Sequence, residues 1–457
     1  MNDQARLARN QKIKKNGATT RARRKKMSCK TYELKVDLSH LSNHTKDRLR
    51  RLFLEAKWFY NHIVTNDLIF TDEPWKLVKV QVRNKDKKFE SRNLNVLSGQ
   101  MKQELVARAK SAISGLSVLK EHGHKVGALK PKKRVGSIQL IQYGTTFDLI
   151  GDRIEVQNID QSLRGHGLGQ VPTTNDTEVA TIRLIQTRDL NYFIHLTVYQ
   201  KKERRTFKTK SGIGIDAGVM NQMMLGDSWS GIGMQIRERV PVTKRLKRIN
   251  RRFSKREKGS EGRRAMKGRL NAEYRHITNT RRDIRNKLTS TKSGIPSYFR
   301  TIATQKDHIS GWQMMWGTRV QTSAIGGIMA ALRSKAHTPI IVDRWTPNTQ
   351  PCPRCGALNP DLKGLENLSN RTPECKECGF RTDRDIWSAD NDANQIPLAE
   401  RKPVDMKTYT KAVDYFNSIP HVKASLMEIP TFETRGKEAE SRQALYQGSH
   451  PTLVGGL

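Results

Sequence analysis

Four cysteines carry the most specific chemistry in this sequence. They form two Cys-x-x-Cys pairs, each followed by glycine, within 27 residues: Cys352, Cys355, Cys375 and Cys378. A Cys-x-x-Cys turn directs two thiolates toward one ion, and two such turns complete a closed tetrahedral set of four sulfur ligands. Thiolates favour zinc over magnesium, and a closed set leaves no open position for a substrate. The spacing therefore predicts a structural Zn²⁺ site, in which the fifth cysteine, Cys29, has no part.

Two further segments carry carboxylates that could hold divalent cations. Asp216 ends an apolar stretch in GIGIDAG, and TDRDIWSADNDAN follows the cysteines with Asp383, Asp385, Asp390 and Asp392. Four carboxylates within ten residues of a basic protein repel one another unless they bind metal or face arginine. On spacing alone, two plainer interpretations stay open. Asp216 could simply cap a turn, and the acidic segment could be the exposed first turn of a helix.

The overall charge indicates the class of partner. The 457-residue chain has 84 Lys and Arg against 44 Asp and Glu, a formal net charge of +40. Self-repulsion on that scale favours binding to a polyanion, so nucleic acid is the expected partner and an acidic membrane surface is the alternative. No apolar run approaches the roughly 18–20 residues that span a bilayer, and the N-terminus lacks the apolar core of a secretory signal. We therefore expect a cytoplasmic nucleic-acid-binding protein.

Positive charge is concentrated in two segments. Residues 1–26 contain ten Lys and Arg and one Asp, which predicts a disordered basic arm that orders on nucleic acid, or else a solubilising tail. Residues 241–290 contain 18 Lys and Arg against four Asp and Glu, with helical spacing. Solvated surface helices usually mix the two signs. This second segment therefore predicts helices that follow a phosphate backbone, with a solvated helix pair as the alternative.

Hydrophobic periodicity predicts an α+β chain. Residues 30–38 alternate as a strand, and residues 42–64 switch to helical spacing behind an Asn43 or Thr45 cap. A second helix is expected over residues 95–123. The period of two returns from 137 to 200, where the IGDR and TRDLN turns indicate hairpins. A strand, a helical excursion and a return to strands together favour a β-barrel with a helical insertion.

The second half of the chain predicts fewer elements. Residues 211–227 have the pattern of two short buried strands around a tight turn, and residues 337–345 form another strand that leads into the cysteines. Beyond residue 400 the charge is nearly balanced, with eight Lys and Arg against six Asp and Glu in 401–457. This last segment is predicted to be a tail, either flexible or able to dock a protein partner.

The order of these features resembles the RuvC nuclease half of the TnpB proteins and of the type V CRISPR effectors descended from them. The shared order is the GIDAG strand, the very basic helical region, a third acidic segment in QKDHISGW, the double Cys-x-x-Cys ribbon and then DRDIWSADN. Upstream, RLFLEAKWFYN is similar to the first recognition-lobe helix of the family, and QLIQYGTTFDLIGDRIEVQNI to its wedge-domain strands. The resemblance covers about residues 30–400. It implies a protein that binds a guide RNA and targets complementary double-stranded DNA, with no membrane partner.

The resemblance also implies a multidomain α+β architecture. Its parts are a basic N-terminal arm (1–29), a wedge β-barrel (30–40 and 135–205), a helical recognition lobe (41–134), an RNase H-like RuvC domain in two parts (206–346, including the basic helical region 241–290, and 381–400), a zinc ribbon (347–380) and a C-terminal tail (401–457).

In this family three carboxylates hold two Mg²⁺ ions, one of which activates a water while the other stabilises the leaving oxygen. The motifs place the first carboxylate at Asp216 and the third at Asp385, with Asp383 as the adjacent alternative. For the second, relatives read approximately QDENIxGW where this chain reads QKDHISGW. Asp307 therefore takes the position of the catalytic glutamate, and Lys306 replaces the acid before it.

The residue at position 307 separates two functional hypotheses. Aspartate is one methylene shorter than glutamate, about 1 Å in reach, and Lys306 adds a positive charge beside a cation site. The first hypothesis is a Mg²⁺-dependent RNA-guided endonuclease that uses Asp216, Asp307 and Asp385, slower than a glutamate-bearing relative. The second is a cleavage-deficient guided DNA-binding protein that represses transcription or recruits a partner through 401–457. A zinc-ribbon RNA-binding protein without DNA targeting is the third.

One difference from the family concerns packing around the third carboxylate. Trp387 and Ser388 occupy positions where the family usually has asparagine and alanine. Because tryptophan is far larger than asparagine, we expect the helix that carries Asp385 to pack differently in this chain.

Overall fold

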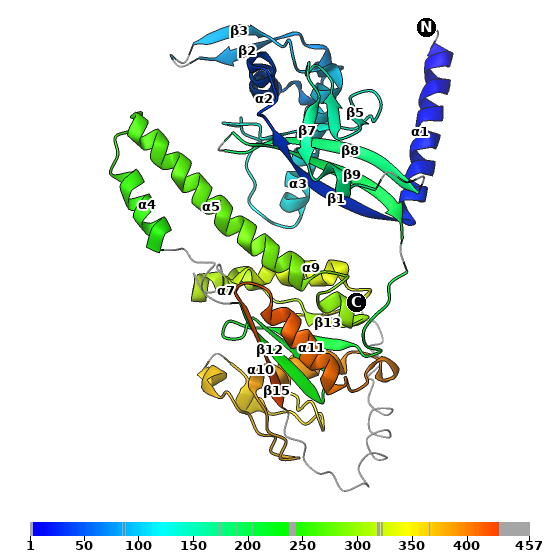
Figure 1. Ribbon diagram of the computed structural model, residues 1–457, viewed down its shortest axis with the longest axis vertical. Coiled ribbons are helices and arrows are strands. Elements are labelled where there is room, and N and C mark those ends of the chain that lie inside the picture. The colour runs from blue at the N-terminus through cyan, green and yellow to red at the C-terminus, as the bar shows by residue number, and fades with distance from the viewer. Residues whose placement is uncertain are drawn as a thin grey trace. The chain divides into compact units, whose positions relative to one another are not determined.

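The computed structural model describes residues 3–428, except for 85, 87, 173, 175, 189, 203, 237–243, 318–319, 321–322 and 365. The chain separates into two compact units, Met1–Arg204 and Arg205–Leu457 (Figure 1). Both units combine helices with sheets, so the α+β class predicted from the sequence is confirmed. None of the helices in the described ranges combines the length and apolarity needed to cross a lipid bilayer.

The first unit is built around a seven-stranded sheet in the order β4-β8-β9-β1-β7-β6-β5, with antiparallel neighbours. The sheet curls into a barrel-like shape (Figure 1). Its elements are α1 (Asp3–Lys25), β1 (Met27–Asp37), α2 (Asn43–Thr65), η1 (Leu68–Phe70), η2 (Pro74–Lys76), β2 (Lys79–Arg83), β3 (Phe89–Asn93), α3 (Gly99–Glu121), β4 (Ser137–Leu140), β5 (Phe147–Ile150), β6 (Arg153–Val156), β7 (Leu163–His166), η3 (Leu168–Gln170), β8 (Thr177–Gln186) and β9 (Tyr192–Lys201).

Both predicted hairpins are confirmed. The strands β5 and β6 pair across the turn at Gly151, where a backbone φ of 59° favours glycine. The strands β8 and β9 pair over nine register positions, with one irregularity between Val179 and Thr181. One strand pair was not anticipated: β2 and β3 form a separate two-stranded sheet inside the segment predicted to be a helical lobe.

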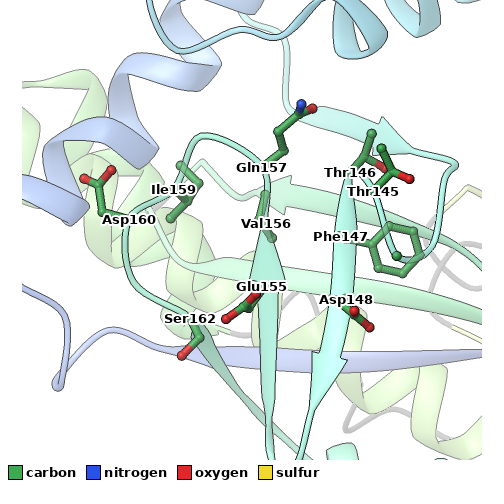
Figure 2. A pocket seen from close by; sticks show the side chains of 11 residues that line it. Thr145, Thr146, Phe147, Asp148, Glu155, Val156, Gln157, Ile159, Asp160 and Ser162 are labelled. Carbon is green, nitrogen blue, oxygen red and sulfur yellow. The ribbon is translucent and has the colours of Figure 1, made fainter.

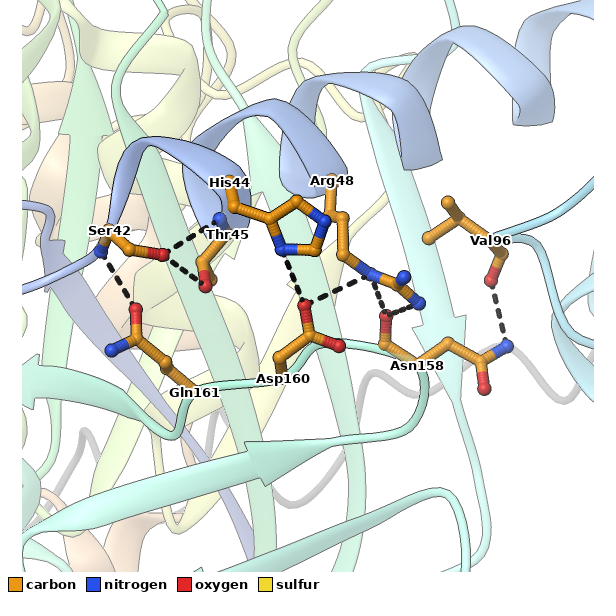
Figure 3. Close-up of polar contacts among 8 residues, drawn as sticks. All are labelled: Ser42, His44, Thr45, Arg48, Val96, Asn158, Asp160 and Gln161. Atoms are coloured by element: carbon orange, nitrogen blue, oxygen red, sulfur yellow. Dashed lines mark hydrogen bonds and ion pairs between the residues drawn. The ribbon is translucent and has the colours of Figure 1, made fainter.

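Helix α2 joins the barrel-like sheet to the helices of the first unit. Its N-cap is Ser42, whose Oγ accepts from the Thr45 N–H at 3.1 Å, so the predicted Asn43 or Thr45 cap was wrong by one to three positions. The same end of α2 binds the loop between β6 and β7. There Ser42 donates its N–H to Gln161 Oε1 at 2.7 Å, and His44 Nδ1 lies 3.0 Å from Asp160 Oδ2 (Figure 3). These contacts fix the entry of α2 onto the sheet.

A pocket lies on strands β5 and β6 of this unit and on the loops beside them (Figure 2). Its lining includes the carboxylates of Asp148, Glu155 and Asp160. Because these three groups would repel a phosphate, the pocket is a poor site for a nucleic-acid backbone.

The N-terminal segment differs from the predicted disordered arm, because α1 is helical. Arg23 and Arg24 hold its last turn against β8 through ion pairs of 2.8 and 2.6 Å with Glu178. Basic residues near a helix C-terminus also interact favourably with the helix dipole. The arm is therefore ordered where it meets the sheet.

The second unit is built around a six-stranded sheet in the order β14-β13-β10-β11-β12-β15. The strands β10, β13 and β14 are parallel, and β11, β12 and β15 continue the sheet antiparallel. Its elements are β10 (Ile213–Ala217), β11 (Met223–Gly226), β12 (Ser230–Ile236), α4 (Lys244–Ser254), α5 (Glu261–Leu288), α6 (Ile295–Tyr298), β13 (Thr301–Gln305), α7 (Ile309–Trp316), α9 (Ile325–Lys335), β14 (Thr338–Val342), η4 (Pro360–Leu362), η5 (Glu366–Ser369), α10 (Arg384–Asn394), η6 (Leu398–Glu400), α11 (Met406–Asn417) and β15 (Val422–Glu428).

The predicted tail begins too early. Residues 401–428 include α11 and β15, and β15 pairs with β12 over seven register positions from Ser230↔Glu428 to Ile236↔Val422. Tyr409 and Phe416 of α11 are fully buried in the core of this unit. The sheet therefore extends to Glu428, and only residues 429–457 of the predicted tail lie outside the described residues.

Helix α10 lies directly against the middle of this sheet, which explains two glycines. A Cβ on Gly214 of β10 would lie 2.0 Å from the Ala389 carbonyl oxygen, and one on Gly226 of β11 would lie 2.5 Å from Asp390 Oδ1. Side chains at these two positions would push the helix off the sheet. The close approach sets the depth at which α10 presents its acidic residues.

Candidate functional site

The four cysteines come together as their spacing predicts. Their sulfur atoms all lie within 4.8 Å of one another, with Cys352 Sγ 3.7 Å from Cys378 Sγ and Cys355 Sγ 3.6 Å from Cys375 Sγ. Zinc–sulfur bonds of about 2.3 Å in a tetrahedron place the sulfurs about 3.8 Å apart. The four thiolates therefore fit one structural Zn²⁺ ion.

The cysteine ribbon is joined to α10 by Trp387. This side chain is fully buried, donates its indole N–H to the Pro351 carbonyl at 2.7 Å and packs 5.7 Å from the Phe380 ring. Trp387 therefore forms a contact between α10 and the cysteine segment. The ribbon consequently helps to hold α10, and with it Asp385, in place.

We expect loss of the ribbon metal to destabilise the second unit. Cys375→Ser removes a buried ligand, and structural zinc contributes folding free energy directly. The purified chain should release one Zn²⁺ on thiol modification, as measured with a chromogenic chelator, and the variant should release none. Its thermal unfolding midpoint should be lower by several degrees. Cys29→Ser, outside the cluster, should change neither value; equal zinc release from the Cys375 variant would contradict this assignment.

Three elements bring carboxylates to one edge of the six-stranded sheet. Asp216 lies near the carboxyl end of β10, Asp307 follows β13 by two residues, and Asp385 stands in the first turn of α10. Because β10 and β13 are parallel, their carboxyl ends meet at the same edge. Burial, together with the charges of Asp385, Asp392 and Asp307, raises the pKa of Asp216 well above its usual range. These acids therefore form one electrostatic cluster.

Asp307 has a free ligand atom. Its Oδ2 is buried and has no hydrogen-bond partner among the residues that the structure describes. Burial raises the pKa of Asp307 to about 6, and the nearby Arg333 guanidinium opposes that shift. A carboxylate oxygen buried without a partner is costly unless a cation completes it. Lys306, beside it in the chain, is exposed.

Asp385 is held by two neighbours. Its Oδ2 accepts from Arg371 Nη2 at 2.7 Å and from Asn221 Nδ2 at 3.2 Å. Arg371 belongs to the segment between the two cysteine pairs, so the ribbon places a cation against the acidic cluster. Asp383, the alternative third carboxylate, is the N-cap of α10 and accepts from the Asp385 N–H at 2.8 Å. Asp383 thus acts as a helix cap, and its Oδ1 also lies 3.7 Å from Arg371 Nη2.

The structure adds a fourth acid to the cluster, Asp392, which the sequence placed in the acidic segment but not among the three expected metal ligands. It lies seven residues beyond Asp385 on α10, which returns it to the same helix face. Its oxygens accept from Asn348 Nδ2 at 2.5 Å and from the Gln305 N–H at 3.3 Å. Burial raises the pKa of Asp392 to about 7. The spacing of seven residues between Asp385 and Asp392 could have indicated a shared helix face. That inference also required knowing that the helix begins at residue 384.

The donor set at this edge fits a hard divalent cation. It consists of carboxylate oxygens, the ligands that Mg²⁺ prefers, and one of them, Asp307 Oδ2, is buried without a partner in the part of the chain that the structure describes. Within the described ranges the cysteines are the group whose ligand atoms all lie within 4.8 Å of one another, so the acids are more widely spaced.

Asp390, the remaining acid of this segment, points to a different part of the core. It is fully buried, its Oδ1 accepts from the Ser228 N–H at 3.0 Å, and its Oδ2 has no partner within the described ranges. Burial raises its pKa from 3.8 to about 7, with Asp227 nearby adding to the shift. The folded state therefore binds this proton more tightly than the unfolded state does.

Asp390 should make the second unit less stable at alkaline pH. The tighter binding of this proton adds to the free energy of unfolding. That stabilisation is complete below pH 3.8 and is lost as the pH rises toward about 7, by up to about 1.4 kcal/mol per pH unit. Asp390→Asn keeps the acceptor for Ser228 and removes the titration. We expect its thermal unfolding midpoint to fall less than that of the wild type between pH 5 and 8, measured by calorimetry. The exposed Asp283→Asn should retain the wild-type slope; identical slopes in all three proteins would refute the assignment.

The basic segment folds as α4 and α5. Met266, Ile277, Ile284 and Leu288 form the buried stripe of α5, and the partly exposed Arg245 of α4 pairs with the buried Glu273 at 3.2 Å. Four acidic residues cannot neutralise the 18 Lys and Arg of residues 241–290. The two helices therefore present a strongly positive surface, as the charge count predicted.

Residues 330–391 match the family model described as Cas12f1-like, TNB domain. The match contains the four cysteines and most of α10, and it confirms the resemblance to compact type V CRISPR effectors for this part of the chain. Among solved structures, a chain of a Cas12f1–sgRNA–target DNA complex aligns with a TM-score of 0.49 and 11% identity, covering 81% of this chain and 99% of that chain. A chain of a CRISPR-Cas12f ternary complex aligns with a TM-score of 0.30 and 13% identity, covering 77% and 82%. No curated protein matches the sequence.

Proposed function

We propose that this chain is an RNA-guided DNA-targeting effector whose second unit carries a RuvC-type nuclease site. The observation that carries the proposal is that Asp216 and Asp307, at the carboxyl ends of two parallel strands, form one electrostatic cluster with Asp385 of α10. The matched cysteine segment comes directly before this third acid. Guide pairing would read the DNA sequence, and the protein would hold the heteroduplex by its shape and charge.

The charge distribution supports the proposed partners. Helices α4 and α5 carry the largest excess of Lys and Arg in the second unit, and α1 adds a basic helix in the first. Cations in such excess release condensed counterions when they meet phosphates, which drives binding to DNA or RNA. A guide RNA and a double-stranded DNA target are the polyanions that this function requires.

The acidic cluster supports phosphodiester hydrolysis. When bound, Mg²⁺ supplies an activated water and stabilisation of the leaving oxygen. Asp216, Asp307 and Asp385 would hold it, while Asp392 fixes the end of β13 through the Gln305 N–H. Asn221 and Arg371 orient Asp385. The side chains thus divide into ligands and positioning residues.

A second candidate is guided DNA binding without cleavage. It is favoured by the short Asp307 side chain and by two guanidiniums near the acids, Arg333 beside Asp307 and Arg371 on Asp385. A guanidinium that stays on Asp385 would compete with a divalent cation for the same oxygen. Such a protein would act by occupying DNA.

One experiment tests the proposal and separates the two candidates. The protein is purified with its RNA and mixed with matched DNA flanked by a randomised motif, and binding and cutting are measured in Mg²⁺ and in Mn²⁺. The nuclease proposal predicts that matched DNA is both bound and cut. Binding without cutting in either metal would leave only the second candidate, and binding that ignores complementarity between RNA and DNA would overturn both.

A further inference from the structure

An exposed tryptophan lies at the same sheet edge as the acidic cluster. Trp345 is 79% exposed and follows β14 by three residues. Since β14 runs parallel to β13, and β13 to β10, all three strands end at one edge. The edge that gathers Asp216 and Asp307 therefore also carries an indole ring open to solvent.

The turn that carries Trp345 is fastened to β13. The Trp345 N–H donates to Asp343 Oδ1 at 2.9 Å, which closes the turn on itself. Gln305, the last residue of β13, donates its Nε2 to the carbonyls of Asp343 and Thr346 at 3.0 and 2.6 Å. Because Gln305 lies two residues before Asp307, the position of the tryptophan backbone is coupled to that of the acid.

The indole ring has a cation beside it. The Arg344 guanidinium lies 4.7 Å from the centroid of the Trp345 ring, and both side chains are exposed. This contact restrains the ring at little cost, so less conformational entropy is lost when a second flat group stacks on it. Single exposed apolar residues are common on protein surfaces. Here, however, a restrained indole, a cation and an acidic cluster share one edge.

We propose that Trp345 is a stacking platform for a base of single-stranded DNA at the acidic edge, with Arg344 contacting the adjacent phosphate. This proposal rests on the proposed function for its choice of DNA. Aromatic side chains stack on any base without sequence preference, which suits an enzyme whose specificity comes from guide pairing. Trp345 would act as a positioning residue, because it would hold the strand without touching the reacting atoms.

Photocrosslinking tests the contact directly. The full chain with its RNA is mixed with a short oligo(dT) that contains one 5-iododeoxyuridine, in Ca²⁺, and irradiated; the adduct is then mapped by mass spectrometry. We expect an adduct at Trp345, a yield about tenfold lower in Trp345→Ala, and partial retention in Trp345→Phe. Trp229→Ala is the matched control, because Trp229 follows β11 at the opposite end of the sheet.

The outcomes separate this inference from the proposed function. A parallel reaction uses an oligo(U) RNA of the same length with one 5-iodouridine. Adducts elsewhere with none at Trp345, or an equal yield at Trp345 with this RNA, would overturn the platform for DNA. If matched DNA is cut, Trp345→Ala should slow cutting about tenfold with unchanged guide-RNA binding, and Trp345→Phe should restore most of the rate. If nothing is cut, the nuclease proposal fails, while the adduct still decides the role of Trp345.

Discussion

Asp307→Ala is expected to lower the rate of DNA cleavage by about a thousandfold or more and to leave guided binding within about twofold. The side chain follows β13 by two residues, and its Oδ2 is buried without a partner among the residues that the structure describes. Removing a ligand from a metal-assisted hydrolytic site costs several kcal/mol of transition-state stabilisation, and about 4 kcal/mol corresponds to a factor of a thousand. Single-turnover cleavage of matched DNA, with binding measured in Ca²⁺, gives both quantities.

Asp307→Glu is the complementary change. It adds the methylene that the family motif has at this position, and it should raise the cleavage rate if reach is limiting. The exposed Asp361→Ala, in the ribbon, serves as the control and should match the wild type. Unchanged cutting by Asp307→Ala would remove this residue from the site. A slower Asp307→Glu would indicate that the neighbouring backbone is already adjusted to aspartate.

The pH dependence of metal binding gives a third readout of the same residue. Burial holds the pKa of Asp307 at about 6, above that of the unfolded chain, and a protonated carboxyl is a poor ligand. At subsaturating Mg²⁺, the cleavage rate should therefore rise as the pH passes from 5 to 7. A flat profile over this range would show that Asp307 does not have to lose a proton.

The sequence predicted the elements whose pattern is local and regular. Strand β1 and the β8–β9 hairpin alternate apolar and polar side chains, because one face of the sheet is buried. Helix α2 has one apolar stripe, and the segment 42–64 predicted for it lies within a residue of the observed ends, although the predicted cap was wrong. The cysteine cluster was also predictable, since its ligands come from two short turns.

Elements that depend on distant partners were missed or misjudged. Strand β15 exists as a strand because β12 offers it an open edge, and nothing within 422–428 reveals that partner. The contact of Asp392 with Gln305 joins residues 87 positions apart. Asp392 lies near Asp307 because α10 packs closely on Gly214. Such packing cannot be predicted from hydrophobic periodicity. The candidate site was therefore predictable in its acids but not in their supporting contacts.

Deleting residues 401–457 is expected to unfold the second unit, whereas deleting 429–457 should leave it folded. The longer deletion removes α11 and β15 and with them the buried side chains of Tyr409, Phe416, Ile419 and Val422. At about 1.5–3 kcal/mol for each fully buried large side chain, the loss is about 6–12 kcal/mol. That is comparable with the whole stability of a typical domain, about 5–15 kcal/mol.

The two deletions also distinguish a structural segment from a docking tail. The longer deletion strips β12 of β15 and exposes Ile232, Met234 and Ile236 at a sheet edge, so aggregation should accompany the loss of a cooperative thermal transition. Phe416→Ala, a smaller cut into the same core, should cost about 3–5 kcal/mol. If the chain that ends at residue 400 were soluble, bound zinc and bound the guide RNA, the second unit would be shown to fold without β15. In that case α11 and β15 would not be needed for folding, and the tail would begin at residue 401, as the sequence predicted.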